Sequence, residues 1–309
     1  MTYSLIIPHY NIPTLLIRCL NSIPVRSDLQ IIVVDDNSTQ ENKEKLKEIE
    51  ANFKHVEFIY STPGRGGGAA RNIGLKAAKG DYVFFADADD FFMPSLSQIL
   101  DDVSKTDSDL IFFNAISVDT DFYTFTYRCW HLNRWIRMHK KKKAKAEFDL
   151  RYAFGEPWCK LIKRSIIEEH QICFDETKIH NDTRFSYLCG FYAKTVSVDQ
   201  RALYCVTERS GSVSKNLTPE RLIKRAEVFA QANKFFKEHE IKRFDERAIR
   251  PLIIFLLAFD FTNFSKCKRV LQDTGMTSLK IYSKLSLYPI YAFRKFAISM
   301  NQYKMRLIG

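Results

Sequence analysis

The stretch Tyr82-Val83-Phe84-Phe85-Ala86-Asp87-Ala88-Asp89-Asp90 decides the fold of this chain. Its first four residues are aromatic or β-branched, which is typical of a strand buried in a central sheet. Three carboxylates then follow within four positions, where the strand ends. Open α/β sheets bind ligands at the carboxyl ends of their strands, so this acidic turn is a candidate ligand site.

Asp87 and Asp89 stand at alternate positions, so they project to the same side of an extended chain. Hard oxygen ligands of this kind hold Mg²⁺ or Mn²⁺, and such a cation also binds a substrate diphosphate. The alternative is a solvated acidic turn that follows a strand by chance. The pattern by itself leaves both interpretations open.

The residues before this stretch alternate between strand and helix patterns. Apolar runs predict strands at 4–8, 30–36 and 56–60, and the segments between them have helical spacing. An order of strand, helix, strand, helix, strand predicts a parallel sheet with right-handed crossovers. Polar residues gather where these strands end, which favours a nucleotide site at that edge.

A glycine-rich segment, Pro63 to Gly74, follows the third strand. Four glycines in five positions allow the backbone to close on a phosphate. The segment has neither the G-x-G-x-x-G spacing of a dinucleotide site nor the G-K-[ST] of a P-loop. A flexible connection to a helix at 69–79 is the alternative.

Composition excludes several classes of protein. The chain has 309 residues, 46% hydrophobic and 27% charged, as expected for a folded globular protein. Its seven cysteines are scattered without a C-x-x-C pair, which favours reduced thiols in the cytoplasm. We expect no signal peptide and no membrane span, because the longest apolar run covers only 251–258. The formal charge of +11 suits a polyanionic partner.

Four segments together resemble the glycosyltransferase family 2 enzymes, which are inverting sugar transferases of the GT-A fold. In order along the chain they are Ser4–Asn11, Ile32–Ser38, Gly68–Leu75 and Ala86–Asp90. The resemblance covers roughly the first hundred residues in both order and spacing. It implies an α/β fold with a mostly parallel sheet flanked by helices, followed here by a C-terminal helical extension.

The resemblance also implies roles for particular residues. The uracil and ribose of a UDP-sugar would lie against Pro8, Tyr10 and Asp36, and Asp87 would contact the ribose side of the nucleotide. Asp89 would bind a divalent cation, Mn²⁺ or Mg²⁺, and Arg65 lies in a loop that contacts base or phosphates. These roles make physical sense, because a tyrosine ring offers a flat face to a base and a carboxylate accepts the uracil imide proton.

The second part of the chain continues the resemblance. Asp182 in His180-Asn181-Asp182 matches the catalytic base of the family, although the commoner Glu before it is replaced by Asn181. Such a carboxylate deprotonates an acceptor hydroxyl as that hydroxyl attacks the sugar. Lys160 and Arg209 are candidate diphosphate or acceptor contacts. Without the resemblance, Asp182 would be read as a helix N-cap and Arg209 as part of an exposed turn.

The C-terminal residues have an unusual composition. After Asp273 there are six basic residues and no acidic one, and aromatic and aliphatic residues lie between them. A basic amphipathic segment of this kind suits an anionic membrane surface. The alternative is a helical appendage packed on the body of the protein or on a second subunit in a homodimer. The lysine-rich run 140–143 is expected to be a solvated loop, or a surface that attracts an anionic acceptor.

We therefore expect a nucleotide-sugar-binding half at 1–100, an acceptor-binding half at 101–215 and a helical extension at 216–309. The predicted reaction moves a sugar from a UDP-sugar to a hydroxyl of a glycan or lipid-linked acceptor in surface polysaccharide synthesis. The predicted location is the cytoplasm, at the inner face of the membrane. Two alternatives stay open: a sugar nucleotidyltransferase, whose glycine-rich signature should follow the first strand, and a nucleic-acid-binding protein, for which no motif occurs. The sequence decides neither the sugar nor the acceptor.

Overall fold

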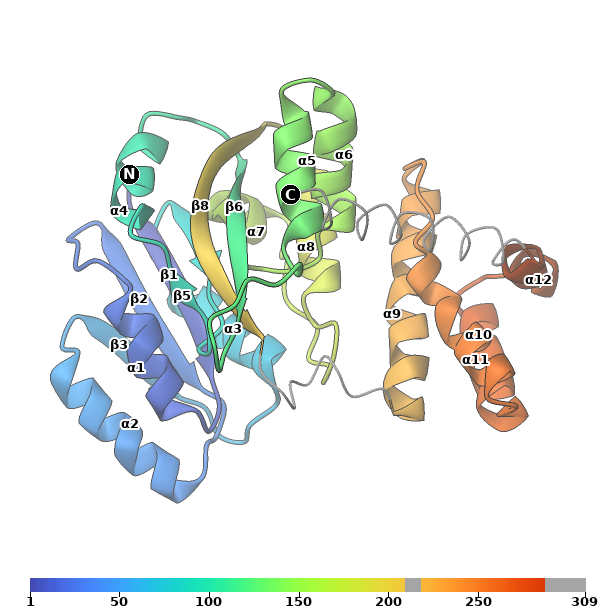
Figure 1. The fold of residues 1–309 in the computed structure, drawn as a ribbon, viewed down its shortest axis with the longest axis horizontal. Helices are drawn as coiled ribbons and strands as arrows, with labels where there is room; N and C mark the ends of the chain where they lie inside the picture. Colours follow the sequence, from blue (N-terminus) through green and yellow to red (C-terminus); the bar gives the residue numbers. More distant parts are fainter. Residues whose placement is uncertain (209–217, 287–309) are drawn as a thin grey trace. The chain divides into compact units, whose positions relative to one another are not determined.

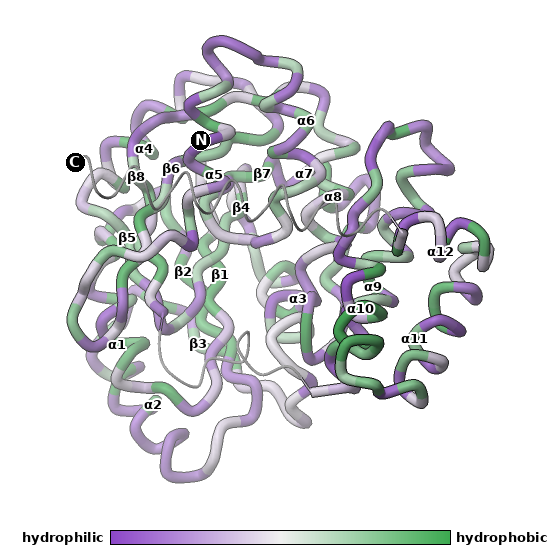
Figure 2. Tube along the Cα trace, turned by 45° about the vertical axis from the view of Figure 1, so that its right-hand side comes forward, coloured by the Kyte–Doolittle hydropathy of each residue, from purple (hydrophilic) through white to green (hydrophobic). Residues whose placement is uncertain are grey.

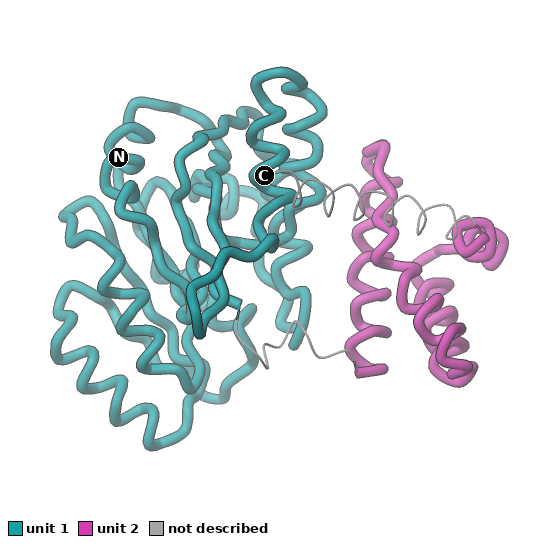
Figure 3. Tube along the Cα trace, viewed as in Figure 1, with its two compact units in different colours: residues 1–213 teal, residues 214–309 magenta. Residues whose placement is uncertain are grey.

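The computed structural model describes residues 1–208 and 218–286. The chain divides into two compact units, unit 1 (Met1–Val213) and unit 2 (Ser214–Gly309) (Figure 3). Each unit has a hydrophobic core of its own. Within the described residues, no helix is both long enough and apolar enough to cross a membrane.

Unit 1 is built on an eight-stranded sheet with the order β3-β2-β1-β4-β7-β6-β8-β5 (Figure 1). The strands are β1 (Tyr3–His9), β2 (Leu29–Asp35), β3 (Val56–Tyr60), β4 (Tyr82–Phe85), β5 (Phe91–Phe92), β6 (Leu110–Asp119), β7 (Lys160–Lys163) and β8 (Val196–Glu208). The predicted strands at 4–8, 30–36 and 56–60 are confirmed, and so is the strand that opens the acidic stretch.

The first four strands are parallel, and their order places β1 between β2 and β4. From β1 the chain moves outward through β2 to β3, and then returns to place β4 on the opposite side of β1. The strand order therefore reverses between β1 and β4. In open α/β sheets, ligands bind at such a reversal, outside the carboxyl ends of the strands.

Three helices cover the parallel half of the sheet. Helices α1 (Pro13–Asn21) and α2 (Gln40–Asn52) lie on one face and α3 (Gly67–Ala77) lies on the other (Figure 2). Helix α3 packs closely on β1, because a Cβ added at Gly74 would lie 2.4 Å from the Ile6 side chain. This arrangement holds the N-terminal end of α3 at the ligand edge of the sheet.

The second half of the sheet is mixed. Strand β7 is antiparallel to both β4 and β6, whereas β8 runs parallel to β6 with a register irregularity near Asn114. The apolar pattern by itself predicts two short closing strands at 196–198 and 202–206, but the structure has the single strand β8. Helix α4 (Leu96–Val103) precedes β6, and α7 (Arg164–Glu169) and α8 (Thr183–Tyr192) lie between β7 and β8.

The segment 119–150, expected to be irregular, contains two helices. They are α5 (Trp130–His139) and α6 (Lys143–Ala153), with the lysine-rich run 140–143 at the turn between them. Each helix buries one short apolar stripe, Leu132 with Ile136 in α5 and Ala146 with Leu150 in α6. A stripe of two residues is too short to stand out among so many basic residues.

Unit 2 is helical in its described part, as the sequence predicts. It comprises α9 (Pro219–Glu238), the 3₁₀ turn η2 (Glu246–Ala248), α10 (Arg250–Leu257), α11 (Phe261–Asp273) and α12 (Ser278–Ser286). Thr218 caps α9 by accepting a hydrogen bond from the Arg221 backbone N–H, so the predicted helix start is confirmed. Ile281 of α12 is fully buried in the core of this unit.

Candidate active site

Parallel registration brings the ends of the first four strands to one edge of the sheet. Pro8 pairs with Val34 and Ile6 with Phe85, so the loops after β1, β2 and β4 emerge side by side. The loop after β3 emerges beside that of β2, because Asp35 pairs with Tyr60. The segments identified from the sequence therefore meet in three dimensions.

The two aspartates that end β2 have different surroundings. Asp35 is fully buried, and its carboxylate is 2.9 Å from Nδ1 of His9 and 2.5 Å from Oγ of Ser38. Burial opposes its ionisation, but the hydrogen bonds from His9 and Ser38 win and lower the pKa of this carboxyl. Asp35 therefore ties the loop after β1 to the loop after β2, which is a structural role.

Asp36 contacts the glycine-rich loop. Its two carboxylate oxygens accept hydrogen bonds from the backbone N–H groups of Arg65 (2.8 Å) and Gly66 (2.7 Å). Glycine is required at position 64, because a Cβ there would lie 2.4 Å from the Asp36 carbonyl oxygen. Asp36 thus shapes the loop in addition to any contact with a base.

Asp87 pairs with Arg71 of α3. The guanidinium donates to Oδ1 of Asp87 at 2.6 Å and to Oδ1 of Asn181 at 3.1 Å. Arg71 is nearly buried and lies over the ring of Phe174. One arginine therefore joins the loop after β4 to the segment that precedes α8.

The acidic turn is fastened from two other elements. Thr207 of β8 donates to the Asp89 carbonyl at 2.5 Å through its hydroxyl and to Asp90 at 2.7 Å through its backbone N–H. Arg18 of α1 also donates to the Asp89 carbonyl. Burial, together with the charges of Asp87 and Asp89, raises the pKa of Asp90, which is therefore a structural carboxyl.

The donor set fits a cation that is shared with a diphosphate. Within the described residues, no group of three or more His, Cys, Asp or Glu side chains is arranged to hold a metal ion. Mg²⁺ in phosphate-handling sites is commonly held by one or two carboxylates together with substrate oxygens. Asp89 is half-buried at the ligand edge and supplies hard oxygen donors of this type.

Asp182 occupies the N-cap position of α8, but its side chain makes no cap hydrogen bond to the described backbone. The pKa of this carboxyl is raised to about 6, chiefly by burial and also by the charge of Glu156, while Arg71 opposes the rise. A general base works best when its pKa lies near the operating pH. A carboxyl with this pKa can exchange a proton near neutral pH.

Glu156 and Lys160 come from the loop and strand beside α8. The Gly155 carbonyl accepts a hydrogen bond from the Ser186 hydroxyl at 2.6 Å, which holds this loop against α8. Lys160 is buried, and its ammonium donates to the Phe154 carbonyl at 3.3 Å and to Ser186 at 3.2 Å. Burial lowers the pKa of Lys160 to about 8. As drawn, the ammonium faces the protein interior, so a contact with diphosphate would need a rearrangement.

The remaining predicted residues are placed as follows. Pro8 lies at the end of β1, and Tyr10 just beyond it is 57% exposed, which leaves its ring accessible to a base. The Arg65 side chain is half-exposed and pairs with Glu176 at 2.9 Å. Arg209 lies outside the described residues.

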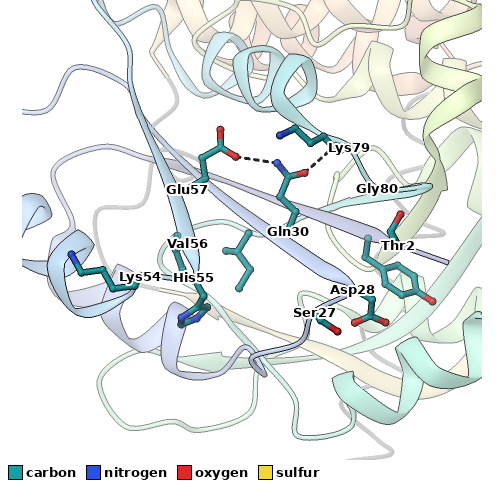
Figure 4. Close-up of a pocket in the computed structure, with 12 residues that line it drawn as sticks. Thr2, Ser27, Asp28, Gln30, Lys54, His55, Val56, Glu57, Lys79 and Gly80 are labelled. Carbon is teal, nitrogen blue, oxygen red and sulfur yellow. Dashed lines mark hydrogen bonds between the residues drawn. The ribbon is translucent and has the colours of Figure 1, made fainter.

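A pocket of about 470 Å³ lies at the other edge of the sheet, at the amino ends of β1 and β2 (Figure 4). Its polar groups pair with one another: Gln30 donates to Glu57 at 3.0 Å and accepts from the backbone N–H of Lys79 at 2.9 Å. Because parallel α/β sheets bind ligands at their carboxyl edge, we assign no role to this pocket.

Comparison with known proteins places the chain in a family. Residues 4–171 match the family model "Glycosyl transferase family 2", and the chain belongs to that family. EpsH of Bacillus subtilis is 28% identical over 214 residues, which are 65% of this chain and 59% of EpsH. The poly(ribitol-phosphate) beta-glucosyltransferase of Bacillus spizizenii is 28% identical over 222 residues, which are 68% of this chain and 33% of that protein. The chain thus matches less than two thirds of either relative.

Solved structures show the same fold. S. aureus TarS residues 1–349 in complex with UDP-GlcNAc superimposes with a TM-score of 0.59 and 20% identity, covering 88% of this chain and 92% of that one. Mannosyltransferase PcManGT from Pyrobaculum calidifontis, in complex with GDP-Man and Mn²⁺, gives 0.54 and 18%, covering 94% and 80%. The predicted GT-A fold is confirmed.

Sequence reasoning missed two functional candidates. Arg71 lies inside the segment Gly68–Leu75 that carries the family resemblance, and Glu156 lies four residues before Lys160, yet the sequence gives neither a role. Their importance comes from partners far along the chain, since Arg71 contacts Asn181 and Glu156 acts on Asp182. For Arg71, the sequence signal that could have found this role is a charged residue in the middle of the small, apolar residues of α3.

Proposed function

We propose that the chain transfers a sugar from a UDP-sugar to a hydroxyl group of a glycan or lipid-linked acceptor, with inversion at the anomeric carbon. The acceptor oxygen forms a bond to the anomeric carbon while the bond from that carbon to the diphosphate oxygen breaks. Asp182 takes the hydroxyl proton, and UDP leaves with the electron pair of the broken bond. The observation that carries this proposal is the position of Asp182 at the start of α8, next to Asn181, which shares the Arg71 guanidinium with Asp87.

The donor side of the proposal uses the edge of the sheet. Tyr10 would stack on the uracil ring, and Pro8 and Asp36 would border it. Asp87, held by Arg71, would face the ribose, with Arg65 near the phosphates. The complex of TarS with UDP-GlcNAc, which shares this fold, supports a UDP-sugar donor.

A divalent cation on Asp89 would neutralise the charge that develops on the leaving diphosphate. The side chains of Thr207 and Arg18 both donate to the backbone carbonyl of Asp89. These two hydrogen bonds fix the backbone from which the Asp89 carboxylate projects. The presence of Mn²⁺ in the PcManGT complex supports this assignment.

The acceptor side would use a second pocket in unit 1. It has a volume of about 360 Å³ and lies between β6, the start of α5 and the residues that join them. Tyr127, which is 63% exposed, and Trp130 offer flat faces for a sugar, and Arg137 offers donors for hydroxyl or phosphate groups. The name of the poly(ribitol-phosphate) beta-glucosyltransferase supports an acceptor of the surface-polymer class, which can be anionic.

Replacing the base tests the proposal. Asp182→Asn should preserve UDP affinity, measured by calorimetry, while transfer falls by about 10²–10⁴-fold, as expected for a lost general base. Asp175 lies on the segment before α8, and its carboxylate pairs with Arg184 of α8. As a control, Asp175→Asn should leave transfer nearly unchanged. If Asp182→Asn removes UDP binding together with activity, Asp182 is structural and the base lies elsewhere.

Removing the cation tests its role separately. Asp89→Ala should abolish turnover and weaken UDP binding measured in Mn²⁺, and EDTA should inactivate the wild-type protein. UDP binding to Asp89→Ala should no longer respond to added Mn²⁺. Turnover that survives both treatments would exclude a catalytic cation on Asp89.

A further inference from the structure

The net charge of this protein is confined to unit 2. Residues 1–213 contain 28 Lys and Arg and 28 Asp and Glu, so unit 1 is formally neutral. Residues 214–309 contain 19 Lys and Arg and eight Asp and Glu, which is the whole +11 of the chain. A helical unit with this excess attracts anionic surfaces, whereas the unit with the candidate active site does not.

Unit 2 also exposes apolar side chains where α10 turns into α11. We call residues 254–261 the α10–α11 corner. Its exposed apolar residues are Ile254 (40%), Leu256 (45%), Leu257 (75%), Phe259 (79%) and Phe261 (59%). Figure 2 shows the hydrophobic colouring along α10. The opposite side of α10 is buried through Leu252 and Phe255, so the helix is apolar on both sides.

Phe259 is held in an unfavourable backbone conformation at the tip of this corner. Its φ is +54°, in the left-handed region, which is strained for an aromatic residue and where glycine is the usual choice. Hydrogen bonds from the Phe259 N–H to the Leu256 carbonyl (3.2 Å) and from the Asp260 N–H to the Phe255 carbonyl (2.9 Å) close the turn. The Phe259 ring lies edge-to-face against that of Phe261, with centroids 6.4 Å apart. An exposed aromatic side chain on a strained backbone points to a role outside the fold.

The charges near the corner favour an anionic partner. From Arg250 to Gln272 the chain has four basic residues and a single acidic one, Asp260. Arg250 pairs with Glu246 at 3.9 Å, and the other three, Lys266, Lys268 and Arg269, lie on α11. The Asp260 carboxylate is engaged in capping α11, accepting from the Asn263 backbone N–H at 3.0 Å and from its side chain at 2.6 Å. Apolar side chains surrounded by basic ones are the combination that binds at the interface of an anionic bilayer.

We propose that the α10–α11 corner docks unit 2 on an anionic phospholipid surface, with Leu257, Phe259 and Phe261 entering the boundary between headgroups and acyl chains. The basic residues of unit 2 attract the anionic surface at long range, and burial of the three apolar side chains in the lipid stabilises the bound state. This docking surface is distinct from residues 287–309, which lie outside the described residues. It is also independent of the transfer reaction.

The test is co-sedimentation of the full chain with large vesicles, either of phosphatidylcholine alone or with 30% phosphatidylglycerol. The wild type should bind the anionic vesicles at 0.1 M salt. Binding should weaken at 1 M, because the Debye length falls from about 10 Å to about 3 Å. Phe259→Gly should bind at least tenfold more weakly, because it removes a large apolar side chain that the lipid would bury. Its melting temperature should stay equal or rise, since glycine relieves the left-handed strain.

Two controls separate the corner from other surfaces. Phe122→Ser removes a side chain of unit 1 that is 82% exposed, and it should leave vesicle binding unchanged. A full-length chain with Arg294, Lys295, Lys304 and Arg306 changed to glutamine should keep a corner-dependent component, still lost on Phe259→Gly. In Phe259→Trp, the new indole should be quenched by brominated lipid; the three native tryptophans lie in unit 1 and provide the background.

Several results would overturn the proposal. Failure of the wild type to bind either vesicle, or equal binding to neutral and anionic vesicles, excludes an anionic lipid surface. Unchanged binding of Phe259→Gly excludes the corner as the docking element. If Phe259→Gly converts a dimer to a monomer in light scattering without lipid, the corner is a contact between two copies of the chain.

Discussion

Arg71 and Asp87 are joined by a hydrogen bond of 2.6 Å between a guanidinium of α3 and the first carboxylate after β4. The same guanidinium reaches Asn181, directly before the candidate base. One side chain therefore joins the loop after β4 to the segment before α8. The commoner Glu at the position of Asn181 would have placed a second carboxylate against this guanidinium, and here the amide oxygen accepts instead.

Arg71→Lys should weaken UDP binding by about tenfold or more, or roughly 1.4 kcal/mol per tenfold. Lysine keeps the charge but cannot hold Asp87 and Asn181 at the same time, because it lacks the planar fork of arginine. Calorimetry with UDP measures the change. Arg184→Lys, at a half-exposed site paired with Asp175, is the matched control and should have little effect. Equal UDP affinity in Arg71→Lys and wild type would show that Arg71 does not position Asp87.

Glu156→Gln should move the acidic limb of the pH–rate profile to lower pH. Burial is the largest cause of the raised pKa of Asp182, and the charge of Glu156 adds to it. Without that charge Asp182 loses its proton more easily, so the active, ionised base persists further into acid. Rates measured between pH 5 and pH 8 test this. A limb that stays in place, or moves upward, contradicts the role assigned to Glu156.

Arg71→Met should shift the same limb in the opposite direction. The guanidinium lowers the pKa of Asp182, so its removal leaves the carboxyl protonated to higher pH. Arg71→Lys keeps the positive charge and should leave the limb where it is in the wild type. If the limb moves in the same direction in Glu156→Gln, Arg71→Met and Arg71→Lys, the cause is a general change in folding rather than these charges.

Asp182→Asn should make the protein more stable at neutral pH. The pKa of Asp182 in the folded chain is raised from 3.8 to about 6, so the folded state disfavours the ionised form. The stability associated with this group is therefore fully present below pH 4 and is lost as pH rises through 6. At 1.36 kcal/mol per pKa unit, the gain in Asp182→Asn above pH 7 is at most about 3 kcal/mol. At pH 4 the melting temperature of Asp182→Asn should equal that of the wild type. At pH 8 it should be higher.

Asp245→Asn should destabilise unit 2. This buried carboxylate accepts from the Arg247 backbone N–H at 3.0 Å and from its side chain at 2.9 Å, and Asn233 holds its backbone. Burial opposes ionisation, but the bonds to Arg247 outweigh it and lower the pKa of Asp245 to about 2. Its contribution is therefore present above pH 4 and disappears as pH falls through 2.

A depression of nearly two pKa units means that Asp245→Asn should lower the free energy of unfolding by up to about 3 kcal/mol. Circular dichroism at pH 7 should therefore show that the variant loses its helix at a lower temperature. Asp273→Asn, which changes an exposed carboxylate of the same unit, is the control. UDP affinity should be unchanged, because every described residue proposed for the donor site lies in unit 1. A melting curve equal to wild type would show that the ion pair contributes nothing.

The sequence by itself determined the parallel half of the sheet and the edge at which its polar residues gather. Strands such as Ile31–Val34 and Tyr82–Phe85 are continuous apolar runs, and only a strand buried on both faces requires such a run. The polar residues that end them had to meet, because parallel strands place their carboxyl ends together. Asp36, Asp87 and Asp89 could therefore be assigned to one edge before any coordinates existed.

Only the tertiary structure decided which partner each charged group finds. Nothing near Lys160 in the chain indicates that its ammonium turns inward to Ser186, and nothing near Arg71 points to Asn181. The same holds for the α10–α11 corner, where an apolar sequence reads equally well as core or as surface until the neighbouring helices are placed. Hydrophobic periodicity is a local property of the chain, whereas burial, pKa and exposure depend on residues distant in sequence, and folding alone brings those together.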